Sequence, residues 1–217
     1  MNRIIIYEPM TALTDLFIAL LGVYFARELH EWYGVRFMNT HWHWSYGFVL
    51  LALGGLLGAI SHGFGPHFPV IVRVAVWKMT LFSIGFAGFF LVMATFYHLF
   101  PFHTVQWLRW IPVILLTGYL FVVSRDDRFI NAVIFYVPAM LFILLAMLYS
   151  KYSLNNPGAG WIAVGIIISF VAAGIQVSGF DLHRHFNHND LYHVVQMAGM
   201  YYIYRGALLI NDFGVVS

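Results

Sequence analysis

Seven long apolar stretches, separated only by short connections, most limit what this chain can fold into. A membrane-spanning helix needs about 20 mostly apolar residues, and each stretch is close to that length. The connections carry turn-forming residues, as in "GFGPHFP" at 63–69 and "SLNNPGAG" at 153–160. The sequence therefore predicts an all-α fold, an integral membrane seven-helix bundle with short loops that forms a single domain over residues 1–217. The predicted spans are residues 10–28, 44–64, 70–99, 107–124, 129–149, 158–180 and 190–210.

The low charge content supports the same class of protein. Only 9% of the residues are charged and 61% are hydrophobic, whereas about a quarter of the residues in a soluble domain are charged. The net charge of +2 gives no field for a nucleic acid, so the expected partner is membrane lipid. We expect a multi-pass membrane location. Basic residues are about evenly divided between the two sides, so the positive-inside rule sets no orientation; a homo-oligomer is left open.

Four ionisable residues, Asp15, His62, Lys78 and His193, lie well inside predicted spans, and Arg205 lies near the far end of the seventh span. Such groups are costly in a bilayer and face the bundle interior by default. Because alternate spans run in opposite directions, the first four fall in the membrane half nearest the N-terminus. We therefore expect one polar pocket between spans one, two, three and seven. Lys78 either extends toward the interface or pairs with Asp15; as a functional group it would anchor an anionic head group or move protons with Asp15.

The start of the seventh span, "FNHNDLYHVVQ" at 186–196, concentrates polar residues. Asn187 or Asp190 can cap this helix, because their side chains accept bonds from free N–H groups of the first turn. Asn189 and His193 are four residues apart and share a helix face, which Gln196 continues. An unpaired imidazole one turn inside the span would be expensive. We therefore expect His193 to face the shared pocket.

The seven spans, the Ser-His pair late in span two and "NDLYH" at the start of span seven resemble the CREST superfamily of alkaline ceramidases and progestin/adipoQ receptors. In that superfamily span two ends with Ser-x-x-x-His, span three carries an Asp, and span seven opens with His-x-x-x-His. His62 and His193 match two of the histidines. Gly58, Lys78 and Asn189 stand where the superfamily has the serine, the aspartate and the remaining histidine.

The resemblance implies an integral-membrane hydrolase that acts on a lipid amide or ester. The superfamily's three histidines hold zinc, whose bound water would be the nucleophile. Either His188 supplies the missing ligand through a local distortion, or the zinc site of the superfamily is lost in this chain. The expected roles are metal ligation by His62, His188 and His193, catalysis by Asp15 and Ser61, and ligand binding by Lys78, Asn189 and Gln196.

Two other functions stay open at this point. The first is a non-enzymatic receptor or transporter for a lipid or small molecule, which would use the same pocket without metal. The second is a haem or quinone redox protein with His62 and His193 as axial ligands. Retinal binding is disfavoured because span seven has no lysine.

The remaining histidines of the opposite membrane half lie among tryptophans near span ends. This pattern is typical of an aromatic belt at the membrane interface. The residues assigned to the belt are His30, His41, His43, His98 and His103.

Overall fold

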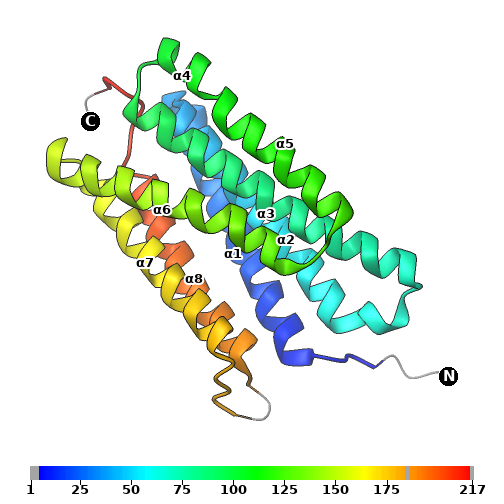
Figure 1. The fold of residues 1–217 in the computed structure, drawn as a ribbon. Helices are drawn as coiled ribbons and strands as arrows, with labels where there is room; N and C mark the ends of the chain where they lie inside the picture. Colours follow the sequence, from blue (N-terminus) through cyan, green and yellow to red (C-terminus); the bar gives the residue numbers. More distant parts are fainter. Residues whose placement is uncertain (1–4, 184–185, 216–217) are drawn as a thin grey trace.

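The computed structural model describes residues 5–183 and 186–215, and its regular elements over these residues are helices. Figure 1 shows the long helices running side by side in an elongated bundle. The all-α prediction is confirmed. The helices are α1 (Pro9–Arg36), α2 (Asn39–Phe64), η1 (Gly65–His67), α3 (Val70–Leu99), α4 (Phe102–Leu108), α5 (Trp110–Arg125), α6 (Phe129–Ser153), α7 (Pro157–Ser178) and α8 (His188–Ala207).

Within residues 5–183 and 186–215, six helical segments are long and apolar enough to cross a membrane, with α4 and α5 forming one of them, Phe102–Arg125. They correspond to the first six predicted spans. The largest difference is at the end of α1, which continues to Arg36, past the predicted end at residue 28. Its last turns are charged but still helical, because Arg and Glu are good helix formers. There Arg27 Nε donates to Glu31 Oε1 at 2.8 Å, a spacing that supports a helix.

Glycines set how closely the helices approach. At Gly55 of α2, a Cβ atom would lie 2.9 Å from the backbone oxygen of Asp15 in α1. At Gly165 of α7, a Cβ atom would lie 2.6 Å from the backbone oxygen of Gly199 in α8. Small residues at such crossings let helix backbones meet. The result is that α1 packs against α2 and α8, and α8 against α7.

The chain after α8 folds over the distal end of the bundle, which we define as the end where α1 finishes and α2 begins. The Asp212 carboxylate accepts hydrogen bonds from the backbone N–H groups of Asn39 and Thr40, at 2.9 and 2.7 Å, and so caps α2. His98 Nδ1 donates to the Asn211 carbonyl oxygen at 2.7 Å, while its Nε2 lies 2.7 Å from Ser150 Oγ.

The belt interpretation is wrong for three histidines at this end. His41, His43 and His98 are buried, and the segment after α8 gives His98 a hydrogen-bond partner. His30 and His103 are exposed, as a belt position requires.

Candidate functional site

A buried polar cluster lies between the first two turns of α1 and the start of α8. The buried face of α1 begins with Thr11, Thr14 and Asp15 and continues with apolar residues such as Ile18 and Ala19. These positions follow the three- and four-residue spacing of one helix face. The stripe that packs α1 into the bundle is therefore polar at the proximal end, where α1 begins, and apolar beyond it.

The first turn of α8 is fixed by a reciprocal cap. The Asn187 side chain accepts hydrogen bonds from the N–H groups of Asn189 and Asp190, at 2.8 and 3.3 Å. In return, Asp190 Oδ2 accepts from the Asn187 N–H at 2.9 Å. The predicted capping by Asn187 and Asp190 is confirmed. The second oxygen of Asp190 accepts from the Thr11 hydroxyl at 2.9 Å, so the cap also ties α8 to α1.

His193, one turn further along α8, contacts α1 through both ring nitrogens. Its Nδ1 lies 2.8 Å from Thr14 Oγ1, and its Nε2 lies 3.3 Å from Asp15 Oδ1. The side chains of His193 and Asp15 are each only 9% exposed. His193 was expected to face a pocket shared with His62; in the structure it lies against α1, beside Asp15.

The hydrogen bonds around His193 place the proton of its neutral ring on Nδ1. The Thr14 hydroxyl has a single hydrogen, which it donates to the Thr11 carbonyl oxygen at 3.0 Å. Thr14 Oγ1 is then an acceptor for the proton on His193 Nδ1. A neutral imidazole with its proton on Nδ1 has a bare Nε2. Asp15 Oδ1 lies 3.3 Å from this Nε2, so a proton held by either atom would lie between the two residues, an assignment that rests on the network.

The other oxygen of Asp15, Oδ2, is buried without a hydrogen-bond partner among the described residues. It lies against Gly58 of α2, where a Cβ atom would be 2.9 Å away. A buried acceptor without a partner is costly. Asp15 thus presents a free oxygen, and Gly58 leaves room for it.

A second acid–histidine pair lies nearer to the surface. His62 follows Gly58 by one helical turn, and its Nδ1 is 2.9 Å from Glu8 Oε2. The side chains of His62 and Glu8 are 29% and 50% exposed. The chain therefore has ionisable groups at two levels of its proximal end: the buried Asp15–His193 pair and, one turn of α2 further out, the half-exposed His62–Glu8 pair.

The other predicted site residues lie apart from the buried pair. Lys78 Nζ donates to the Ser124 carbonyl oxygen at the end of α5, at 2.7 Å, so the predicted Lys78–Asp15 ion pair is wrong and the lysine extends toward the proximal end. Gln196 donates to Ser169 Oγ of α7 at 3.2 Å. The polar residues that were predicted to share one pocket between four spans are therefore separated. Asp15 and His193 remain paired between α1 and α8, beside α2.

The two remaining predicted residues are half-buried. Ser61 lies beside His62, and Asn189 lies in the first turn of α8. No side-chain hydrogen bond joins either of them to the buried pair within residues 5–183 and 186–215. Instead, Asp190, three residues before His193, reaches α1.

The predicted metal ligands do not converge. His62 pairs with Glu8 and His193 with Asp15, while His188 Nδ1 lies 2.8 Å from Asp181 Oδ1. In the part of the chain that the structure describes, no group of three or more His, Cys, Asp or Glu side chains is placed to hold a metal ion. This arrangement does not fit a three-histidine zinc site, and zinc binding stays a prediction.

The loop before α8 contains a further polar contact. Hydrogen bonds from the side chain and backbone N–H of His188 lower the pKa of the Asp181 carboxyl group. This contact holds the loop to the helix that carries His193.

Thr11 and Thr14 were missed from the sequence, although a signal was present. Thr11, Thr14 and Asp15 have the spacing of one helix face, and Asp190 and His193 are three residues apart. Pairing these two faces would have placed both threonines in the site.

The family model described as "Family of unknown function (DUF6962)" matches residues 10–212. The chain belongs to this family. The matched region runs from the first turn of α1 to the Asp212 cap, so it includes the buried Asp15–His193 pair and His62, while Glu8 lies just before it. No curated protein and no solved structure matches the chain.

Proposed function

We propose that this chain is an integral-membrane seven-helix protein that hydrolyses a lipid amide or ester at the buried Asp15–His193 pair. Six segments have the length and apolar character of spans, and α8 is the proposed seventh. Its 20 residues correspond to about 30 Å of helix, the thickness of a bilayer core. The polar residues that lower its hydropathy include Asp190 and His193, which are buried against α1.

The observation that carries the proposal is the 3.3 Å contact between His193 Nε2 and Asp15 Oδ1, beside a carboxylate oxygen without a partner among the described residues. We infer that the two residues share one proton. When the proton is on His193, Asp15 is a carboxylate and its Oδ2 can take a proton from water. The hydroxide adds to the carbonyl carbon of the lipid. Asp15 then gives its proton to the amine or alcohol as the C–N or C–O bond breaks, and the acyl part leaves as a carboxylic acid. Positioned acid–base groups contribute about 10²–10⁴-fold to a rate.

The resemblance to the ceramidase and adipoQ-receptor superfamily supports the same location. His62 and His193 are the residues that match its histidines, and they belong to the two acid–histidine pairs at the proximal end. A carbonyl group presented from the bilayer would meet Asp15 at this end.

A second candidate, a receptor or transporter that moves protons, is favoured by the His62–Glu8 pair. His62 lies one turn of α2 beyond Gly58, the residue that contacts Asp15. The His62–Glu8 pair is partly exposed, so it would connect the buried pair with water. This candidate uses the same residues without bond cleavage.

Turnover of defined lipids tests the proposal. Purified protein in lipid nanodiscs is assayed with fluorogenic lipid amides and esters, alongside Asp15→Asn and His193→Gln. We expect wild-type turnover and a loss of about 10²-fold or more in each variant. His103→Gln, an exposed histidine at the distal end, is the matched control and should keep the wild-type rate. An absence of turnover together with Asp15-dependent proton flux in liposomes would favour the second candidate.

Elemental analysis of the same protein decides the role of metal. The acid–base proposal expects turnover to persist after chelation. Stoichiometric zinc that is lost in His62→Gln and His193→Gln, together with turnover that stops on chelation, would replace it with the zinc chemistry that the resemblance implies.

A further inference from the structure

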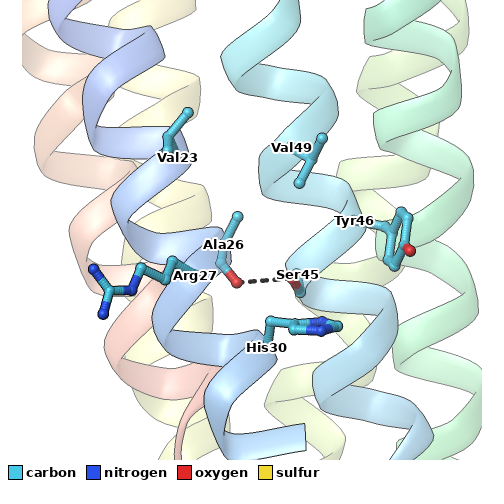
Figure 2. Close-up of a pocket in the computed structure, with 7 residues that line it drawn as sticks. All are labelled: Val23, Ala26, Arg27, His30, Ser45, Tyr46 and Val49. Carbon is cyan, nitrogen blue, oxygen red and sulfur yellow. Dashed lines mark hydrogen bonds between the residues drawn. The ribbon is translucent and has the colours of Figure 1, made fainter. Parts of the chain in front are cut away.

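A groove lies on the outer surface between α1 and α2, in the distal half of the bundle and apart from the Asp15–His193 pair. Its volume is about 350 Å³, and Figure 2 shows its lining residues on the two helices. They are Val23, Ala26, Arg27, His30, Ser45, Tyr46 and Val49.

The floor of the groove exists because two small residues meet there. The Ser45 hydroxyl donates to the Ala26 carbonyl oxygen at 2.8 Å, and both residues are buried. On the side nearer the middle of the helices, Val23 and Val49 are exposed. In a bilayer, this apolar end faces the hydrocarbon chains.

The other end of the groove is polar. His30 points into the space between the helices, and the Arg27 guanidinium points away from α2 (Figure 2). Arg27 pairs with Glu31, and both side chains are largely exposed. An exposed pair four residues apart contributes little to stability, so each partner is free to exchange it for a ligand.

A second hollow, of about 210 Å³, lies on the same part of α1 and is lined by Glu28, Glu31, Trp32 and Val35. Two carboxylates are groups that bind ammonium ions, while the Trp32 ring already lies under the Arg36 guanidinium. Arg27 lines the first hollow and Glu31 the second, so their ion pair lies at the boundary between the two.

We propose that the two hollows together bind the head of a zwitterionic glycerophospholipid, a phosphatidylethanolamine or phosphatidylcholine. Its phosphate lies at Arg27, at the boundary between the two hollows, its ammonium group lies at Glu28 and Glu31, and one acyl chain runs along the apolar end of the groove. The ion pair Arg27–Glu31 presents the two charges that such a head group complements. Arg36 lies over the Trp32 ring at 4.6 Å, so two arginines and two glutamates surround the hollows, and this balance of charge suits a head group without net charge. The inference rests on the bilayer location in the proposed function and is independent of the hydrolytic chemistry.

Native mass spectrometry of the detergent-purified full chain tests this site. Phosphatidylethanolamine, phosphatidylcholine and phosphatidylglycerol are titrated separately. We expect the two zwitterionic lipids to bind more tightly than phosphatidylglycerol, and Arg27→Gln to weaken their binding about tenfold. Arg109→Gln, at an exposed arginine that stacks on Trp110, is the matched control and should bind as the wild type does.

A double variant separates lipid binding from helix stability. Arg27→Glu with Glu31→Arg keeps an intrahelical ion pair but places a carboxylate where the lipid phosphate is expected. We expect it to fold and to lose the zwitterionic lipids. Wild-type binding by this variant and by Arg27→Gln, or equal binding of phosphatidylglycerol, would overturn the inference. Asp15→Asn should keep lipid binding while losing turnover, so failure of this site and failure of the proposed function give different results.

Discussion

At the scale of single residues, the position of the unpartnered Asp15 oxygen depends on Gly58, because glycine has no side chain to displace it. A Cβ atom on Gly58 would lie 2.9 Å from Asp15 Oδ2. We predict that Gly58→Ala displaces the carboxylate and destabilises the protein by about 1–3 kcal/mol. Thermal unfolding in detergent measures the change. Gly118→Ala is the control, because nothing lies within 4 Å of its Cβ position, and it should be neutral or slightly stabilising. Equal effects of the two substitutions would show that Asp15 does not lie against Gly58.

The contact between Asp181 and His188 predicts a pH dependence. Because the pKa of Asp181 is lowered in the folded protein, its contribution to stability is present above the unfolded value of about 3.9. That contribution is lost as pH falls through the folded pKa. Carboxyl NMR should find Asp181 titrating below the ordinary range, and His188→Ala should raise its pKa toward that range. An ordinary Asp181 pKa in the wild type would contradict the contact.

Which residues pair could be predicted only in part. The sequence placed Asp15 and His193 in the bundle interior, because buried charge in a membrane is expensive. It could not tell that Lys78 would reach a carbonyl group of α5 instead of Asp15, since a long flexible side chain has several partners within reach. It also favoured Asn189 over Asp190 as the neighbour of His193, because spacings of three and four residues both share a face.

At the scale of the helices, the α7–α8 contact holds His193 in place and depends on glycine. A Cβ atom on Gly165 would lie 2.6 Å from the Gly199 backbone oxygen, which has no flexible end that can move aside. We predict that Gly165→Ala costs about 1–3 kcal/mol. Gly174→Ala on the same helix, with nothing near its Cβ position, should not destabilise. The two variants are compared by their unfolding midpoints, and a stable Gly165→Ala would mean that α7 and α8 are further apart.

The Asp212 cap fixes the distal end of α2. Its carboxylate accepts from two backbone N–H groups of the first turn. Asp212→Ala should cost about 0.5–2 kcal/mol and speed hydrogen exchange at the start of α2. Asp212→Asn keeps one acceptor oxygen and should cost less. Unchanged exchange in both variants would rule out the cap.

Hydropathy predicted some helix ends correctly and others not. The α3 span was predicted at 70–99 and is observed as Val70–Leu99, because Pro69 and Pro101 bound an apolar run. The α1 span was predicted too short, since hydropathy marks where lipid contact ends, whereas the helix continues through charged turns to Arg36.

At the scale of the whole molecule, the order and length of the apolar segments were sufficient to predict an all-helical bundle. The segment after α8 was not predictable in this way, because its role depends on contacts with α2 and α3 that are distant in sequence. For the same reason the distal histidines were assigned to the surface. In Figure 1, α8 lies beside α7 and its first turns are at the proximal end, where the sequence expected the functional residues.

The most direct test of the central claim compares single and double variants in the lipid turnover assay. Two residues that share one proton act as a unit, so their effects are not additive. We predict that Asp15→Asn combined with His193→Gln lowers turnover no further than the more damaging single variant does. Losses that multiply, or wild-type turnover in either single variant, would contradict a shared-proton site at Asp15 and His193.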